Sequence, residues 1–198
     1  TRMGFISSVM AEPAVIRVPA DYPTIQMAID AASPGDVVLV TSGTYYEHVT
    51  VNKSLTLLGE DRTTTIIDGN GTTGNVVSVT ANNVVIDGFT IRNSEGGGVY
   101  LHQSNGSVIT SNTITSNKYD GVRLYKSQNN TISGNTVLNN GHGDCILKGG
   151  GVALGDSNNN TISRNTIGSN FFGVLLNTAW NNTIIGNKIS NNGIGIRA

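Results

Sequence analysis

Charged side chains are scarce in this chain, because only 13% of its 198 residues are Asp, Glu, Lys or Arg, against the usual ~25%. The formal net charge of −1 supplies no basic face for phosphates, so no nucleic-acid partner is expected. No apolar run approaches the ~20 residues that a membrane span needs, so no span is expected either. A single cysteine, Cys145, excludes an internal disulfide framework.

Asparagine and glycine take the place of the missing charges. The chain has 25 of each, and every Asn lies at or after Asn52, so the first fifty residues differ in composition from the rest. The apolar content of 37% is enough for one domain with a core. Residues 4–11 form a short apolar run with a small-residue ending, a pattern compatible with the remnant of a signal peptide although it is short for one. We therefore expect an extracellular, cell-surface or periplasmic location.

A repeated pattern organises the chain from Asn82 onward. Each copy reads apolar, two variable residues, Asn, Thr, apolar, then a turn and Gly-apolar-x-apolar. The copies are anchored at Ile86, Ile109, Ile132, Ile162 and Ile184. A period of 22–30 residues is typical of a solenoid, whose units bury their apolar faces against each other.

Alternating apolar positions over three or four residues predict very short strands with one face inward. Three such strands per ~22 residues, joined by Asn and Gly turns, predict an all-β fold: a single-stranded parallel β-helix of about seven coils. We expect one continuous domain, with an N-terminal strand, a helix and the first coils in residues 1–64 and regular repeats in residues 65–198.

A short helix is predicted near the N-terminus. Asp21, Pro23 and Thr24 resemble a helix start. The apolar residues that follow recur at helical spacing, at Ile25, Ala28, Ile29 and Ala32. We expect this helix to cover the first coil, because the terminal unit of a solenoid needs a polar outer face.

One Asn recurs at the same place in successive coils, with Phe89 there in the first. Stacked amides can hydrogen-bond along the rod, so a structural ladder is predicted. Its rungs are Asn112, Asn135, Asn165 and Asn187. Glycosylation sequons also occur, and most are expected to be by-products of Asn-Thr turns. They begin at Asn52, Asn70, Asn105, Asn129, Asn159 and Asn181.

Asp68 and Asp87 each precede a glycine and take matching places in the pattern of adjacent coils. Carboxylates stacked ~5 Å apart would share a proton or hold a cation such as calcium. The alternative is that each Asp caps its own turn. No cofactor is required in the second reading.

The copy that begins at Ile132 carries seven extra residues, within 141–150, and an insertion in a solenoid often marks the binding face. Aromatic rings beside hydrogen-bonding groups suit a sugar polymer, so a glycan site is predicted at the corner around residues 118–148. Its predicted binding residues are Tyr100, His102, Tyr119, Arg123, Tyr125 and Lys126. Its candidate catalytic residues are Arg123, Lys148, Asp120, Asp144 and His142. Decoration of an ordinary loop is the alternative.

Several segments carry a family resemblance. Residues 18–26, Gly43-Thr44-Tyr45 and residues 65–69 resemble the opening of pectin-lyase-like right-handed β-helix proteins. The Asn-Asn-Thr-Ile repeats resemble those of the NosD-type and carbohydrate-binding or sugar-hydrolase families. The resemblance implies the fold over nearly the whole chain but no single activity, because this fold hosts many.

The motifs of the enzymes with this fold are mostly missing. Gly141-His142-Gly143 resembles a polygalacturonase segment, but the paired carboxylates of an inverting hydrolase are not found elsewhere. We therefore expect a surface module with a structural or glycan-binding role. One alternative is a polysaccharide lyase or hydrolase, in which a basic residue would remove a proton beside a carboxylate. Another is a NosD-like copper protein with His142 and Cys145 as ligands.

The repeat stops partway through a coil at residues 194–198. The unpaired strand edge there predicts end-to-end or edge pairing with another copy, or a continuation of the coils in a longer protein.

Overall fold

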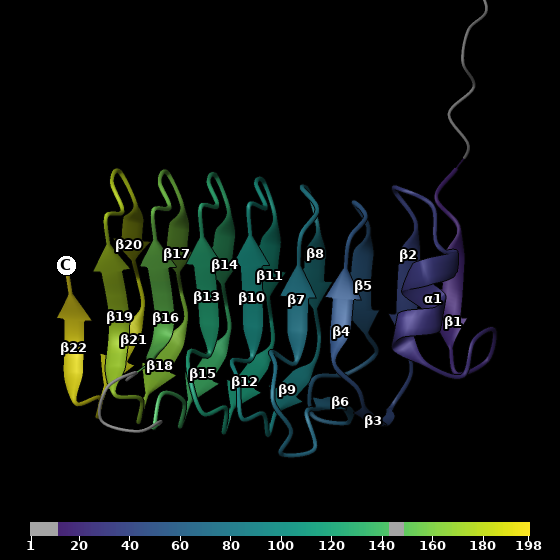
Figure 1. The fold of residues 1–198 in the computed structure, drawn as a ribbon, viewed down its shortest axis with the longest axis horizontal. Helices are drawn as coiled ribbons and strands as arrows, with labels where there is room; N and C mark the ends of the chain where they lie inside the picture. The colour runs from purple at the N-terminus through teal and green to yellow at the C-terminus, as the bar shows by residue number, and fades with distance from the viewer. Residues whose placement is uncertain (1–11, 143–148) are drawn as a thin grey trace, which may run out of the picture.

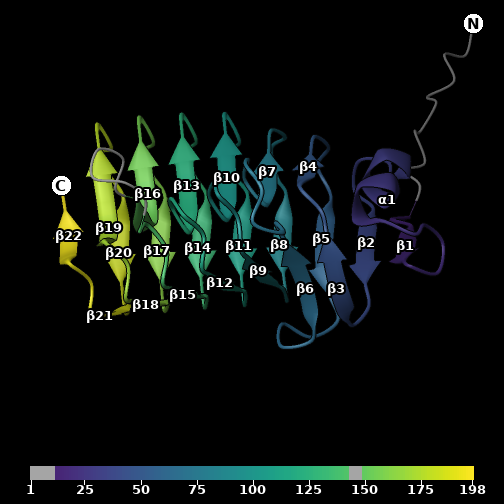
Figure 2. The same ribbon diagram turned by 60° about the horizontal axis from the view of Figure 1, so that its bottom comes forward.

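The computed structural model, which describes residues 12–142 and 149–198, is a rod of stacked coils with a helix at one end (Figure 1). Every coil contributes short strands to three parallel sheets that run along the rod. Figure 2 shows the same strands following one another without a break from the helix to the last coil. The predicted all-β parallel β-helix is therefore confirmed.

The first two sheets each take one strand from every successive coil. Sheet 1 contains β1 (Val15–Val18), β2 (Val37–Val40), β5 (Thr56–Gly59), β8 (Val85–Asp87), β11 (Val108–Thr110), β14 (Thr131–Ser133), β17 (Thr161–Ser163) and β20 (Thr183–Ile185). Sheet 2 contains β3 (Gly43–Tyr46), β6 (Thr65–Asp68), β9 (Thr90–Arg92), β12 (Thr113–Thr115), β15 (Thr136–Leu138), β18 (Thr166–Gly168) and β21 (Lys188–Ser190).

Sheet 3 contains β4 (Val49–Val51), β7 (Val77–Val79), β10 (Val99–His102), β13 (Val122–Tyr125), β16 (Gly150–Gly155), β19 (Phe172–Asn177) and β22 (Ile194–Arg197). Sheets 2 and 3 have seven strands and sheet 1 has eight, because β1 precedes the helix and adds a partial turn to the seven predicted coils. The sheets run through the predicted boundary at residues 64 and 65.

The core fills the inside of the rod with stacked aliphatic side chains. In sheet 1, Ile86, Ile109, Ile132 and Ile162 pair in register on successive strands and are all fully buried. Because each coil alone exposes its inner face at both ends, this burial requires the neighbouring coils. The predicted alternation of buried and exposed residues is confirmed in strands such as β11 and β13.

From residue 111 onward, each corner of the rod repeats one turn: a residue with positive φ followed by an Asn, which is buried in all but the last coil. At the corner between sheets 1 and 2, Gly134 has φ 65° and precedes Asn135. The Asn135 side-chain nitrogen donates to the Ile109 carbonyl at 2.8 Å and to Asn165 Oδ1 at 3.1 Å. The predicted ladder of Asn112, Asn135, Asn165 and Asn187 is therefore confirmed.

The same arrangement makes two further ladders that the sequence reasoning did not identify. One follows the corner between sheets 2 and 3, and the other follows the corner between sheets 3 and 1. Their rungs are Asn117, Asn140, Asn170 and Asn192 in one, and Asn130, Asn160 and Asn182 in the other. All three corners are thus closed by amides that satisfy the turn backbone.

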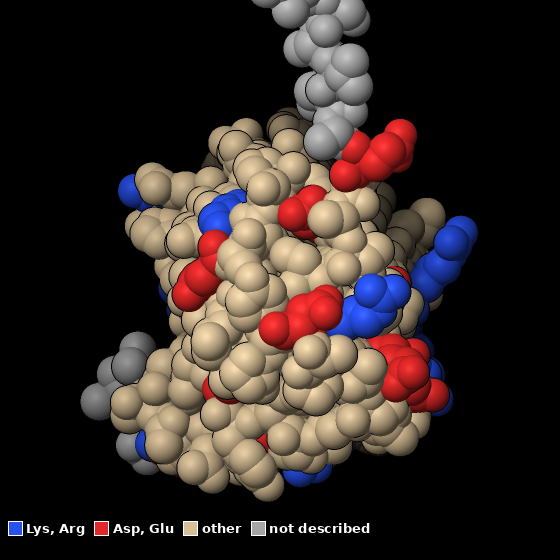
Figure 3. All heavy atoms as spheres, turned by 90° about the vertical axis from the view of Figure 1, so that its right-hand side faces the viewer, with Lys and Arg blue, Asp and Glu red and all other residues tan. Residues whose placement is uncertain are grey.

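The helix α1 (Ile25–Ala31) covers the first coil, as predicted, and buries Ile25, Ala28 and Ile29. Its N-cap is Thr24, one turn of chain later than the predicted start near Asp21, whose carboxylate instead accepts the Arg17 N–H. At this capped end, acidic and basic side chains lie among mostly uncharged surface (Figure 3).

Tertiary contacts satisfy both ends of this short helix. The Glu47 carboxylate accepts the N–H groups of Ile25 and Gln26, each at 3.0 Å. The Lys53 ammonium donates to the carbonyls of Asp30, at 2.6 Å, and Ala32, at 2.8 Å. These contacts complement the partial charges at the two helix ends.

The two described ends of the seven-residue insertion form a narrow neck. Gly141 and Gly149 approach so closely that a Cβ on Gly141 would collide with the Gly149 carbonyl. Gly141 N–H still donates to the Asn117 carbonyl, and the Phe172 N–H donates to Gly149. The coils on either side therefore keep their register. Residues 143–148 lie outside the described residues.

The last coil leaves apolar side chains in contact with solvent: Ile194 is 41% exposed and Ile196 is 51% exposed. End-to-end or edge association of copies through this coil stays a prediction, which light scattering at high concentration would test.

Candidate functional site

The outer face of sheet 3 brings together five of the predicted binding residues. Register pairs Tyr100 on β10 with Arg123 on β13, and His102 with Tyr125, while Lys126 follows directly after β13. Their alternation with buried Val and Leu residues points these side chains outward. We call this group the aromatic–basic cluster: Tyr100, His102, Arg123, Tyr125 and Lys126.

The rings of the cluster contact one another in a row. The Tyr100 and His102 rings are stacked with centroids 5.7 Å apart, and the His102 and Tyr125 centroids are 5.8 Å apart. The Lys126 ammonium lies 5.3 Å from the centroid of the Tyr125 ring, within cation–π range. The cluster therefore presents aromatic edges and faces together with positive charge.

Small residues make the floor beside the cluster. Ala153 on β16 pairs in register with Arg123, and Gly155 pairs with Tyr125. A Cβ on Gly155 would lie 3.3 Å from Cδ2 of Tyr125, so the ring rests against the backbone of β16. A shallow hollow here is lined by Asp120, Arg123, Ala153, Leu154, Gly155, Leu175 and Asn177.

Asp120 is the buried acidic group of this hollow. Its carboxylate accepts the Gly150 N–H at 2.6 Å and lies 3.4 Å from a guanidinium nitrogen of Arg123. Burial raises the pKa of Asp120 above its ordinary value, and the Gly150 N–H and the Arg123 charge only partly offset this effect. Arg123 itself stays about half exposed, so its charge is available on the face.

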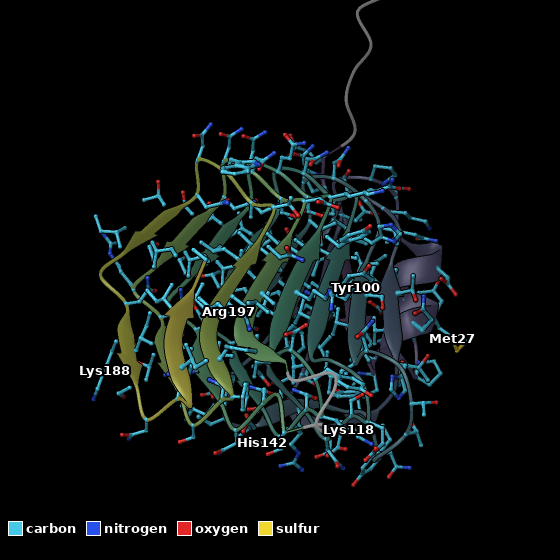
Figure 4. All side chains as sticks on the ribbon, turned by 60° about the vertical axis from the view of Figure 1, so that its left-hand side comes forward. Met27, Tyr100, Lys118, His142, Lys188 and Arg197 are labelled. Carbon is cyan, nitrogen blue, oxygen red and sulfur yellow. The ribbon has the colours of Figure 1, made fainter. Side chains whose placement is uncertain are left out.

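A second group of predicted residues lies elsewhere. Lys118 forms an ion pair with Glu95 at 2.7 Å, and the His142 ring is 3.0 Å from the Ser169 carbonyl. Both lie at the turns between sheets 2 and 3, and Figure 4 shows them at the edge of the rod, apart from Tyr100 and Arg197. Among the described residues, the corner predicted around residues 118–148 is thus divided between the outer face of sheet 3 and the turns that precede its strands.

The remaining predicted residues do not join the cluster. Tyr119 is half-buried in the turn before β13, where its N–H donates to the Gly96 carbonyl. Asp144, Cys145 and Lys148 lie outside the described residues. The catalytic roles predicted for Arg123, Asp120 and His142 stay predictions.

The predicted stacking of Asp68 and Asp87 is wrong. Asp68 belongs to sheet 2, in register with Arg92, whereas Asp87 belongs to sheet 1, in register with Leu58 and Thr110. The two sequence patterns look alike because both strands end in Asp-Gly, but they fill different corners of the coil. The geometric reason for a shared proton or a calcium ion at this pair therefore disappears.

Asp68 has a structural set of partners instead. It accepts from Arg92 Nε, from the Asn93 side chain and from the Asn70 N–H, each at 2.8 Å. Burial acts to raise the pKa of Asp68, but these donors outweigh it and lower the pKa below its ordinary value. Within residues 12–142 and 149–198, no three His, Cys, Asp or Glu side chains converge as metal ligands would.

Sequence reasoning missed the floor of the site. Ala153, Gly155 and Leu175 carry no chemical motif, and only their register with Arg123 and Tyr125 places them beside the cluster. The available signal was small or aliphatic residues at outward positions of the repeat, where the neighbouring coils carry Tyr and Arg.

Among the helices of the described chain, none is long and apolar enough to cross a bilayer.

Known proteins resemble this chain in sequence and in fold. A "Cell surface glycoprotein" of Methanothermus fervidus is 36% identical over 78 residues, which are 38% of this chain and 13% of that protein. The chain thus spans only a small part of the relative's length. The family model "Periplasmic copper-binding protein (NosD)" matches residues 146–198.

Two solved structures share the fold. An alginate lyase from Paenibacillus sp. superposes with a TM-score of 0.70 and 16% identity over 88% of this chain and 75% of that one. The protein of ORF18 of Geobacillus virus E2 superposes with a TM-score of 0.74 and 20% identity, over 87% of this chain and 41% of that one. At these identities the likeness concerns the fold alone.

The family model "Right handed beta helix region" matches residues 47–171, more than half of the chain and most of the coils described above. The chain therefore belongs to the right-handed β-helix family, and its fold is that of pectin-lyase-like proteins.

Proposed function

We propose that this chain is a β-helix module of an exported, surface-located protein and that it binds a glycan on the outer face of sheet 3. The observation that carries the proposal is the aromatic–basic cluster, with its ring contacts and its floor of small residues. Flat rings beside hydrogen-bonding groups suit sugar rings, which offer apolar faces and many hydroxyls. A surface location is supported by the cell-surface relative and by the periplasmic family that matches the last coils.

The register of sheet 3 supports one direction for the bound polysaccharide. Tyr100, Arg123, Ala153, Leu175 and Arg197 occupy one register line across β10, β13, β16, β19 and β22. Because neighbouring strands lie ~4.8 Å apart, a polymer along this line would meet a new side chain at each coil. Arg123 and Arg197 stand three strands apart on it, with two aliphatic residues between them. A linear polymer parallel to the rod axis fits this line.

Binding is tested with the unglycosylated chain on a panel of immobilised neutral and uronate polysaccharides, with and without calcium. We expect retention on at least one polymer, and an affinity about tenfold or more weaker in Tyr100→Ala and Tyr125→Ala, as for the loss of a central contact ring. Tyr46→Ala is the matched control, because Tyr46 is 67% exposed on sheet 2, away from the cluster. Retention on no polymer, or an equal loss in Tyr46→Ala, would contradict the proposal.

A second candidate, a polysaccharide-active enzyme, is supported by Asp120. A buried carboxyl with a raised pKa, beside an Arg in a hollow, is a common feature of acid–base sites. The same carboxylate also accepts the Gly150 N–H beside the neck of the insertion, which is a structural role. The incubations above distinguish the two roles when unsaturated products and reducing ends are measured. Product that disappears in Asp120→Asn while retention persists would favour the enzyme.

Copper handling, the third alternative, has little support. The segment that matches the copper-binding family, residues 146–198, contains no His, Cys or Met at all. These are the side chains that bind copper through nitrogen or sulfur. The match is better explained by the repeated Asn turns, which fill this segment.

A further inference from the structure

We propose that Asn129, Asn159 and Asn181 form an acceptor edge for N-linked glycans along the corner between sheets 3 and 1. Each is followed by a second Asn and then Thr, which completes the acceptor sequon. They occupy the same place in three successive coils, directly before β14, β17 and β20. The natural occurrence of such glycans rests on the proposed exported location, but the ability to accept them does not.

Each acceptor side chain projects from a rigid turn into solvent. Asn129, Asn159 and Asn181 are exposed and have φ of 57°, 57° and 55°. The Asn after each one, by contrast, is a ladder rung that donates to a backbone carbonyl, and it is buried at Asn130 and Asn160 and half-buried at Asn182. The exposed carboxamides have no hydrogen-bond partner in the described part of the chain, so their nitrogens are free to react.

Turn geometry alone explains the Asn but not the Thr. The left-handed conformation favours Asn or Gly, and the equivalent turns of the two earlier coils carry Asn83 and Gly106. The strand residue two positions later is Val85 or Val108 in those coils, in register with the Thr of the later ones. A β-branched residue without a hydroxyl is therefore sufficient for the strand.

The other three sequons differ because their hydroxyls have structural partners. Ser54 donates to the Asn82 carbonyl at 2.7 Å, and Thr72 donates to the Gly69 carbonyl at 2.8 Å. Ser107 is buried and accepts the Val84 N–H at 3.1 Å. Within the described residues, the hydroxyls of Thr131, Thr161 and Thr183 have no such partner. A structural reason therefore accounts for the sequons at Asn52, Asn70 and Asn105 but not for the aligned three.

The reaction joins the Asn side-chain nitrogen to C1 of the first sugar. The C1–O bond to a lipid-linked phosphate donor breaks, the lipid phosphate leaves with the electron pair, and the amide nitrogen loses one proton. The donor and the transferase come from the export pathway. Adjacent acceptors are ~4.8 Å apart, closer than two bulky glycans can stand side by side, so a single molecule should carry glycans at no two neighbouring positions.

The test expresses the full chain behind a secretion leader in a host that performs N-glycosylation. Intact mass and glycopeptide mapping should show added glycan at Asn129 and Asn181 together or at Asn159 alone. The triple variant Thr131→Val, Thr161→Val, Thr183→Val copies the chain's own Val85 and Val108, and should lose this mass with an unchanged melting temperature. Thr113→Val, an outward Thr of sheet 2 outside any sequon, should lose none.

Three outcomes would overturn the proposal: no added mass, glycan confined to Asn52, Asn70 or Asn105, or no loss in the triple variant. Three glycans on one molecule would overturn the spacing argument. Because polysaccharide binding is measured on unglycosylated protein, failure of either proposal leaves the other one testable.

Discussion

The two halves of the rod close the same coil with different chemistry. In the capped half, residues 12–101, individual contacts hold the turns: Glu47 and Lys53 hold the helix, and Asp68 holds Arg92 and two backbone or amide groups. In the ladder half, residues 102–142 and 149–198, stacked Asn side chains recur at all three corners of the coil. Amide ladders need identical turns in neighbouring coils, whereas unequal turns need contacts that fit only one place.

The insertion shows how tolerant the ladder is. In the sequence, residues 143–148 stand between Asn140 and β16. The side-chain hydrogen bond from Asn135 to Asn165, which spans this longer coil, is nevertheless 3.1 Å long, against 3.2 Å for the bond from Asn112 to Asn135 in a regular coil. The ladder depends on the corner and not on the length of the loop between corners. Extra residues are therefore accepted wherever their two ends can meet, as the glycine neck allows.

The largest predicted effect concerns a middle rung. Asn135→Leu keeps the branching and the number of side-chain heavy atoms but leaves the Asn112 N–H and the Ile109 carbonyl buried without these partners. At about 1–3 kcal/mol for each of these two groups, we expect the free energy of unfolding to fall by roughly 2–6 kcal/mol. Unfolding in denaturant measures this loss of free energy. Ser163→Ala, a half-buried hydroxyl of the same half, is the control and should change little. A loss below about 1 kcal/mol in Asn135→Leu would mean that the ladder is dispensable.

A smaller effect is expected in the capped half. Asp68→Asn removes a charge that accepts three donors, but Arg92 is 41% exposed, so solvent screens the pair and we expect a loss of about 1–3 kcal/mol at neutral pH. The pKa of Asp68 is lowered in the folded state, so its stabilisation is present above the ordinary Asp pKa and is lost as the pH falls through the folded value. The difference between variant and parent should therefore shrink in acid. A difference independent of pH would contradict the charged role.

The smallest predicted effect concerns Asp120, whose contribution to stability changes with pH in the opposite direction. The pKa of Asp120 is raised in the folded state, so the folded chain holds its proton more tightly than the unfolded chain does. Stability at this group is therefore greatest below the ordinary Asp pKa and decreases as the pH rises through the folded value. The melting temperature of Asp120→Asn, relative to the parent, should be higher at pH 7 than at pH 4. The reverse trend would show that the Arg123 pair outweighs burial.

The repeat made the fold predictable, because period, alternation and turn residues agree with each other. The recurrence of Ile86 along the chain predicts the stacking of the coils, and the recurrence of Asn112 predicts the ladder that the structure contains. The helix start was misplaced by a few residues because Asp21, Pro23 and Thr24 all carry start signals. The Thr24 cap and the Glu47 contact together fix one beginning.

The candidate site was less predictable. Tyr100, His102, Arg123, Tyr125 and Lys126 were identified as a group from their outward positions, and the structure brings them together. Residues 118 and 142 fell within the same predicted patch because they occupy equivalent corners of neighbouring coils, just before strands of sheet 3. A strand and the turn before it face different directions, which nearness along the chain does not reveal.

By itself, the sequence determined the coil, its inward residues and its amide corners, because these follow from local periodicity and from the conformations that Asn and Gly accept. Only the tertiary structure decided which strands align. It separated Asp68 from Asp87, buried Asp120 beneath Arg123 and placed Gly155 under the ring of Tyr125. These are contacts between coils. They depend on how strands that lie 22–30 residues apart in the sequence align with each other, which no local pattern specifies.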